Sequence, residues 1–162
     1  MKKLAELINE RSTNQSKLAD LANRIKRDAI YLETDEPNAN VESNYTKYLE
    51  TLTRNEKIIN LINKANDTTI LRNGMTISAA LVHRDIVSKQ IGFHKDLIEN
   101  LLNRKASSPY HYIQSTENKP LKNLCVLDTD KLQNTLDELY VSYRAIDSEI
   151  QATNWQTEVN DQ

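Results

Sequence analysis

Three histidines and one cysteine are the residues of this sequence with the most chemical potential for catalysis or metal binding. His83 and His94 are eleven residues apart on one expected helix, which separates them by about 16 Å along its axis, so they cannot share a metal ion within one chain. His111 falls in an expected loop. Cys125 lies in the apolar run 124–127 and is expected to be a buried small hydrophobe rather than a nucleophile. We therefore expect no catalytic residue, no metal and no cofactor, and predict that the protein is not an enzyme.

One arginine stands at an apolar position of an expected helix. Arg84 lies between Ala80 and Val87 on the helix seam, where an unpaired charge is costly to bury. It needs an anionic partner. An internal ion pair that fixes helix register is one interpretation, and an arginine facing a bound anion is the other. The candidate partners within the chain are Asp85, Asp147 and Glu149.

A polar stripe beside the apolar seam of the last expected helix suits a small ligand. Its members step by three and four residues along one edge of the helix, and the chain then reaches a tryptophan. Arginine supplies charge, the amides offer donors and acceptors, and the indole can stack on a planar molecule. The alternative is a solvated flank with one weak ion pair. The stripe consists of Tyr140, Arg144, Asp147, Gln151 and Asn154, followed by Trp155.

Composition narrows the fold class to a mainly helical single domain, residues 1–162. Two glycines and three prolines in 162 residues are too few for a Rossmann domain, a P-loop enzyme or a β-sandwich. A net charge of -2 argues against general nucleic-acid binding. The single cysteine forms no internal disulfide, no apolar signal core follows the basic start, and no apolar run reaches the roughly 20 residues that span a bilayer. We expect a cytoplasmic protein that does not act on membranes.

Two long helices are expected to form an antiparallel hairpin in the first part of the chain. Apolar positions recur at alternating intervals of three and four residues in both helices, and Pro37 interrupts the helical pattern between them. The first seam is Leu4, Leu7, Arg11, Asn14, Leu18, Leu21, Ile25, Asp28 and Leu32, and the second is Val41, Tyr45, Tyr48, Leu52, Asn55, Ile59, Ile62 and Asn66. Since two helices alone are marginally stable, other helices or other subunits must cover them.

The rest of the chain predicts a small β element and two further helices. Asn73-Gly74 indicates a β-hairpin over about 68–77. Thr76 or Ser78 caps a helix that runs to about residue 105, and Asp128 or Thr129 caps the last helix. Between them we expect a loop over 106–120 and an extended segment over 121–127 that could pair with the hairpin, and the polar tail, about 156–162, is expected to fray. The two helical seams are Ala80, Arg84, Val87, Ile91, His94, Ile98 and Leu101, and Leu132, Leu136, Leu139, Tyr143, Ile146 and Ile150.

Several short runs resemble the septicolysin-like family of small bacterial proteins. The most specific is the closing Ile-Gln-x-x-Asn-Trp of residues 150–155, and the others are 62–66, 73–77, 80–81, 84–85 and 144–147. The resemblance implies a helical fold with a small β element and a ring-like homo-oligomer, a hexamer. Where family members tend to carry basic residues beside a tyrosine, this chain keeps the tyrosine, Tyr112, but has His111 and residues 113–117 without them. Tyr112 joins the candidate ligand-binding residues.

Three functions follow as hypotheses. In the first, a homo-oligomer holds a small polar or nucleotide-like ligand in clefts between subunits. If a phage encodes the chain, this oligomer would act as a sponge for a host immune nucleotide. In the second, implied by the family name, the protein forms pores, although its seams are narrow and interrupted by Asn14, Asn55 and Asn66. In the third, the chain is a structural scaffold whose polar seam residues set the oligomeric state.

Overall fold

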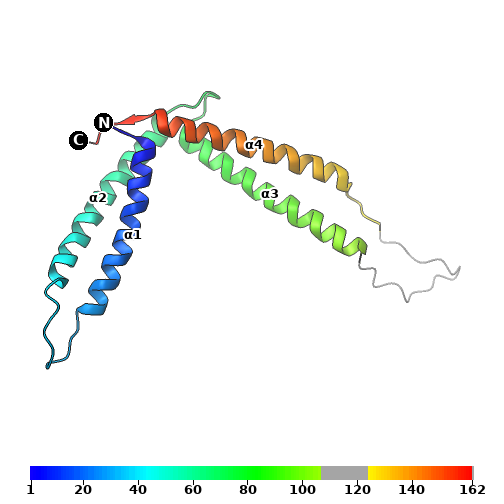
Figure 1. The fold of residues 1–162 in the computed structure, drawn as a ribbon. Coiled ribbons are helices and arrows are strands. Elements are labelled where there is room, and N and C mark those ends of the chain that lie inside the picture. The colour runs from blue at the N-terminus through cyan, green and yellow to red at the C-terminus, as the bar shows by residue number, and fades with distance from the viewer. Residues whose placement is uncertain (107–123, 162) are drawn as a thin grey trace, which may run out of the picture. The chain divides into compact units, whose positions relative to one another are not determined.

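The fold is mainly helical, as expected from composition. The structure, a computed structural model, describes residues 1–106 and 124–161. Within these ranges it has four helices, α1 (Leu4–Asp28), α2 (Val41–Thr68), α3 (Ile77–Ala106) and α4 (Thr129–Gln156), and two short strands, β1 (Lys2–Lys3) and β2 (Glu158–Val159) (Figure 1). The chain predicted as a single domain is organised in two compact units, Met1–Ala79 with Glu149–Gln162 and Ala80–Ser148, so α3 and α4 contribute to both.

The first unit contains the predicted antiparallel hairpin of α1 and α2, which lie side by side (Figure 1). Burial along α1 follows the predicted seam, because Leu4, Leu7 and Leu21 are buried. The seam ends earlier than predicted. The helix stops at Asp28, whose carboxylate accepts a hydrogen bond from Asn38 Nδ2 at 2.9 Å. Leu32 therefore lies beyond the helix and is 70% exposed.

The predicted seam of α2 is confirmed at Asn55 and Ile62, which are buried, and wrong at Tyr45, Leu52 and Ile59. The residues of α2 that are buried against the rest of the first unit are Thr51, Asn55, Ile58, Ile62 and Ala65. Tyr45 and Leu52, assigned to the seam from spacing, are 55% and 45% exposed, and Ile59 is half-buried. Both rows repeat at three and four residues, so periodicity alone does not decide which one faces α1.

A two-stranded sheet joins the two ends of the chain, and the hairpin predicted over 68–77 is reduced to a turn with a single antiparallel bridge. Gly74 takes the positive φ of 83° that the turn requires, but only one bridge, between Ile70 and Thr76, closes around it. The two-stranded sheet pairs β1 with β2 antiparallel, Lys2 opposite Val159. The tail predicted to fray is thus held by a backbone ladder, and Val159 is buried.

The second unit contains most of α3 and α4, which run side by side in opposite directions (Figure 1). Ala80, Val87, Leu136 and Ile146 are buried, in agreement with both predicted seams. The predicted caps are also present. Thr76 Oγ1, in the first unit, accepts the backbone N–H of Ala79 at 3.1 Å, and Asp128 Oδ1 accepts that of Asp130 at 3.0 Å.

Part of the predicted connection between α3 and α4 lies outside the described residues. Residues 107–123, with Tyr112, His111 and most of the expected loop, are in this part. Of the extended segment expected over 121–127, residues 124–127 are described and form no strand. Leu124 and Val126 are fully exposed and Cys125 is only half-buried, so the prediction of a buried cysteine is wrong. The sheet found within residues 1–106 and 124–161 pairs β1 with β2 and does not include this run.

Candidate functional site

Arg84 is paired within the second unit. Its Nη1 donates to Asp147 Oδ1 at 2.9 Å, and its Nη2 lies 3.5 Å from Asp85 Oδ1. Burial by itself would lower the pKa of Arg84, but the hydrogen bond and the charge of Asp147 outweigh burial, and the pKa is raised. The arginine on the seam therefore has an internal partner. The other candidate partner, Glu149, accepts the backbone N–H of Arg72 at 2.6 Å in the first unit.

The polar stripe of α4 does not form one continuous contact. In the second unit, Arg144 is exposed and its Nε donates to the carbonyl oxygen of Tyr140 in its own helix. Further along α4, in the first unit, Gln151 is exposed, Trp155 is 56% exposed and Asn154 is only 7% exposed. Of the predicted ligand-binding residues the structure thus joins Arg84 and Asp147 directly. Tyr112 lies outside the described residues.

An ion cluster in the first unit was not predicted. Arg54 of α2 donates through Nη1 and Nη2 to both oxygens of Asp161 at 2.6 Å, and through Nε to Glu10 of α1 at 2.8 Å. Lys2 adds a contact to Glu10 at 2.7 Å. The sequence holds one hint, since Glu10 and Arg54 flank the hairpin seam, where interhelical ion pairs form. Nothing local marks Asp161.

We call this ion cluster the clamp, because its ion pairs hold the end of the chain in place. The hydrogen bond from Arg54 lowers the pKa of Asp161 to about 2, and it also lowers the pKa of Glu10. Both carboxylates are therefore ionised at neutral pH and bind Arg54 in that form. Since Asp161 follows β2 by two residues, the clamp holds the strand that closes the sheet.

The seam between α1 and α2 is polar in its middle. Arg11 Nε, Asn14 Nδ2 and Asn55 Oδ1 are buried atoms without a hydrogen-bond partner among the described residues. Thr51, also buried, satisfies its hydroxyl on the Lys47 carbonyl oxygen at 2.7 Å. Buried polar groups that lack partners cost stability. In coiled coils such residues select register and oligomeric state, which is the role that the scaffold hypothesis gives them.

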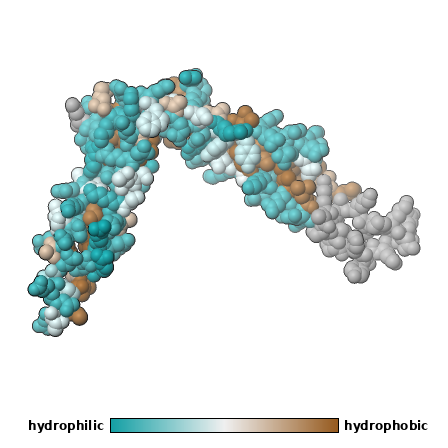
Figure 2. Space-filling model, in the orientation of Figure 1, coloured by the Kyte–Doolittle hydropathy of each residue, from teal (hydrophilic) through white to brown (hydrophobic). Residues whose placement is uncertain are grey.

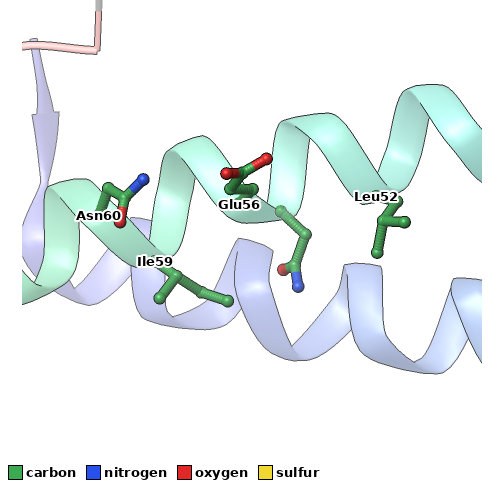
Figure 3. A pocket seen from close by; sticks show the side chains of 5 residues that line it. Leu52, Glu56, Ile59 and Asn60 are labelled. Carbon is green, nitrogen blue, oxygen red and sulfur yellow. The ribbon is translucent and has the colours of Figure 1, made fainter.

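Two surface grooves are each lined by residues of a single helix, and none of these residues belongs to the polar stripe. The α2 groove, of about 280 Å³, is lined by Leu52, Asn55, Glu56, Ile59 and Asn60 (Figure 3). The α3 groove, of about 320 Å³, is lined by Phe93, Asp96, Leu97, Asn100, Leu101 and Arg104. Four residues at spacings 0, 3, 4 and 7 make up the holes that receive knobs in coiled coils. Both grooves contain such a set, so each has the form of a helix-docking site.

Each groove continues a row of large apolar side chains, most of which are exposed. We call Tyr45, Leu49, Leu52, Glu56 and Ile59 the α2 stripe, and Val82, Ile86, Lys89, Phe93 and Leu97 the α3 stripe. Tyr45, Leu49 and Leu52 are 55%, 44% and 45% exposed, and Val82, Ile86 and Phe93 are 65%, 48% and 64% exposed. Hydrophobic patches are visible on both units, amid a mainly hydrophilic surface (Figure 2). Exposed apolar rows of this kind mark interaction surfaces.

Neither a metal cluster nor a membrane span is found in the part of the chain that the structure describes. No three His, Cys, Asp or Glu side chains of residues 1–106 and 124–161 gather as metal ligands. No helix within these ranges combines the length and hydropathy needed to cross a bilayer.

The described residues form two antiparallel helical pairs, and a two-stranded sheet joins the ends of the chain. The chain belongs to a family of unknown function, DUF6847, whose model matches residues 11–159. It is similar to the crystal structure of a functionally unknown conserved protein from Corynebacterium diphtheriae, with 29% sequence identity, a TM-score of 0.81, and coverage of 98% of this chain and 99% of that one. No curated protein matches. Neither finding bears on the septicolysin-like resemblance, which stays a prediction.

Proposed function

We propose that this protein is a non-enzymatic, homo-oligomeric binding protein of the cytoplasm, which holds a small polar or nucleotide-like ligand in clefts between its subunits. The observation that carries the association is the α2 stripe. Its large side chains repeat at coiled-coil spacing, yet Tyr45, Leu49 and Leu52 are about half exposed. A helix with two apolar rows is typical of bundles with more than two helices. A second copy supplies the missing helix.

Charges placed on the α2 stripe test the association. Leu49→Lys combined with Leu52→Lys is expected to weaken self-association by about 30-fold or more, because charges in the centre of an apolar interface lose about 2 kcal/mol or more. Light scattering over a concentration series measures the change in mass. Ser43→Lys is the matched control, since Ser43 is exposed and lies about half a turn away on α2. A wild-type chain that stays monomeric at all concentrations would contradict the proposal.

The ligand part of the proposal is supported by the α4 residues in the first unit. Trp155 offers an exposed indole, and the amide-bearing Gln151, one turn earlier on α4, is also exposed. An indole with a nearby amide suits a planar, polar molecule such as a nucleobase. If a phage encodes the chain, the protein would act as a sponge that removes a host nucleotide signal.

Mass spectrometry of small molecules released from the denatured, purified protein tests for this ligand. Calorimetry against a nucleotide pool follows, in which we expect Trp155→Ala to weaken binding by about tenfold or more through lost stacking. Tyr31→Ala, another exposed aromatic residue in the first unit, is the control. Arg144→Ala tests whether the positive charge of Arg144 contributes to ligand binding, and this variant leaves the Arg84–Asp147 pair intact. No released ligand and no heat would leave the scaffold hypothesis as the better account.

A further inference from the structure

The α2 groove presents one carboxylate beside an apolar wall. Asn55 also lines the groove, but it is only 7% exposed and its Oδ1 is buried, so this oxygen is not open to another molecule. Glu56, next to Asn55, forms no ion pair within the described residues. Leu52 and Ile59 complete the hole (Figure 3). A side chain with an apolar stem and a cationic end with several donors fits this lining, and lysine has both.

The α3 stripe carries such a lysine. Lys89 lies between Ile86 and Phe93 in the row, at steps of three and four residues. It is exposed and makes no ion pair with any residue in the described ranges. Each apolar row thus contains one charged residue, which is the acidic Glu56 in the α2 stripe and the basic Lys89 in the α3 stripe.

In one antiparallel register of the two stripes, side chains of each stripe lie over the groove of the other. When the helices run antiparallel with Leu52 level with Phe93, Lys89 lies level with Glu56, over the α2 groove. In the same register Leu49 and Tyr45 lie over successive holes of the α3 groove. The knobs of each stripe therefore meet the holes of the other, as in coiled-coil packing.

We propose that the α2 stripe of one copy packs antiparallel on the α3 stripe of a second copy, with Lys89 of the second copy seated in the α2 groove against Glu56. This inference rests on the proposed function and specifies its subunit contact. Because the two stripes differ, the contact is heterologous. Each copy uses its α2 stripe toward one neighbour and its α3 stripe toward another, which builds rings or chains instead of isolated two-fold dimers.

Charge reversal and its repair test the contact. Glu56→Lys and Lys89→Glu are each expected to weaken self-association by about tenfold or more, because each places like charges together. The double variant, Glu56→Lys with Lys89→Glu, is expected to return to within about threefold of the wild type. Sedimentation over a concentration series measures all of these. Glu50→Lys is the control, since Glu50 is exposed on α2 outside the stripe, and circular dichroism verifies that every variant is folded.

A mixing experiment separates a heterologous contact from a two-fold one. A Leu52→Lys chain and a Phe93→Lys chain should each be monomeric alone and form a one-to-one pair when mixed. The inference is supported if the double charge-reversal variant associates again and if the two mixed chains form the one-to-one pair. Wild-type oligomers that ignore the reversals, a double variant that stays weak, or a Phe93→Lys chain that dimerises alone would overturn it and leave the proposed function standing. A monomeric wild type would overturn both.

Discussion

Arg54→Met is expected to lower the free energy of unfolding by about 2 kcal/mol. The arginine binds Asp161 and Glu10 through three hydrogen bonds of 2.6 to 2.8 Å, and its side chain is 30% exposed while that of Asp161 is 14% exposed. Removing one partner of a buried ion pair costs 3–5 kcal/mol in other proteins because a carboxylate is left uncompensated. Partial exposure reduces this figure. Urea denaturation followed by circular dichroism measures the loss.

The matched control for this variant is Arg24→Met. Arg24 pairs with Asp20 at 2.9 Å one turn away on α1, and both side chains are more than half exposed. Such a surface pair is worth about 0.5 kcal/mol or less. Equal losses in the two variants would show that the cluster of Arg54 and Asp161 contributes no more than an ordinary surface contact.

Acid provides a second measurement on the same cluster. The pKa of Asp161 is about 2 in the folded chain and about 3.9 in an unfolded one. A lowered folded pKa stabilises the protein above the unfolded value, and this stabilisation is lost as the pH falls from about 5 through 2. Arg54→Met should lose less stability over this interval than the wild type does, because the variant lacks the largest cause of the lowered pKa of Asp161.

Ile58→Ala is expected to lower the free energy of unfolding by about 3 kcal/mol. Ile58 is fully buried, with 0% exposure, and truncation of a buried isoleucine costs about 2–5 kcal/mol through lost burial and the cavity left behind. The adjacent Ile59 is half-buried, on the α2 stripe. We expect Ile59→Ala to cost less than about 1 kcal/mol in the monomer, and denaturant titration of both variants makes the comparison.

The order of these two losses tests which row of α2 faces α1. Measured on a background that carries Leu52→Lys, so that self-association does not contribute, Ile58→Ala should be the more damaging change. A larger loss for Ile59→Ala would mean that the row predicted from spacing is the buried one.

The part of the candidate site that depends on a single helix face could be predicted from the sequence. Arg84 lies on an apolar seam, so a need for a partner, with Asp147 among the candidates, follows from spacing. The structure confirms that pair. The α2 and α3 stripes were not recognised, because spacing marks a row as apolar without telling whether another helix covers it. Tyr45, Leu52 and Ile59 fit the three-and-four pattern as well as the row that is buried.

The sequence alone determined the helical class, the seams of α1, α3 and α4, the caps at Thr76 and Asp128, and the turn at Gly74. Each of these depends on residues within about two helical turns, and their chemistry acts locally. Tertiary structure decided which row of α2 packs on α1, which strands form the sheet, and the cluster that joins Lys2, Glu10, Arg54 and Asp161. These contacts bring together residues far apart in the chain, since Arg54 and Asp161 are separated by 107 positions and Lys3 and Glu158 by 155, and no local preference encodes such pairings.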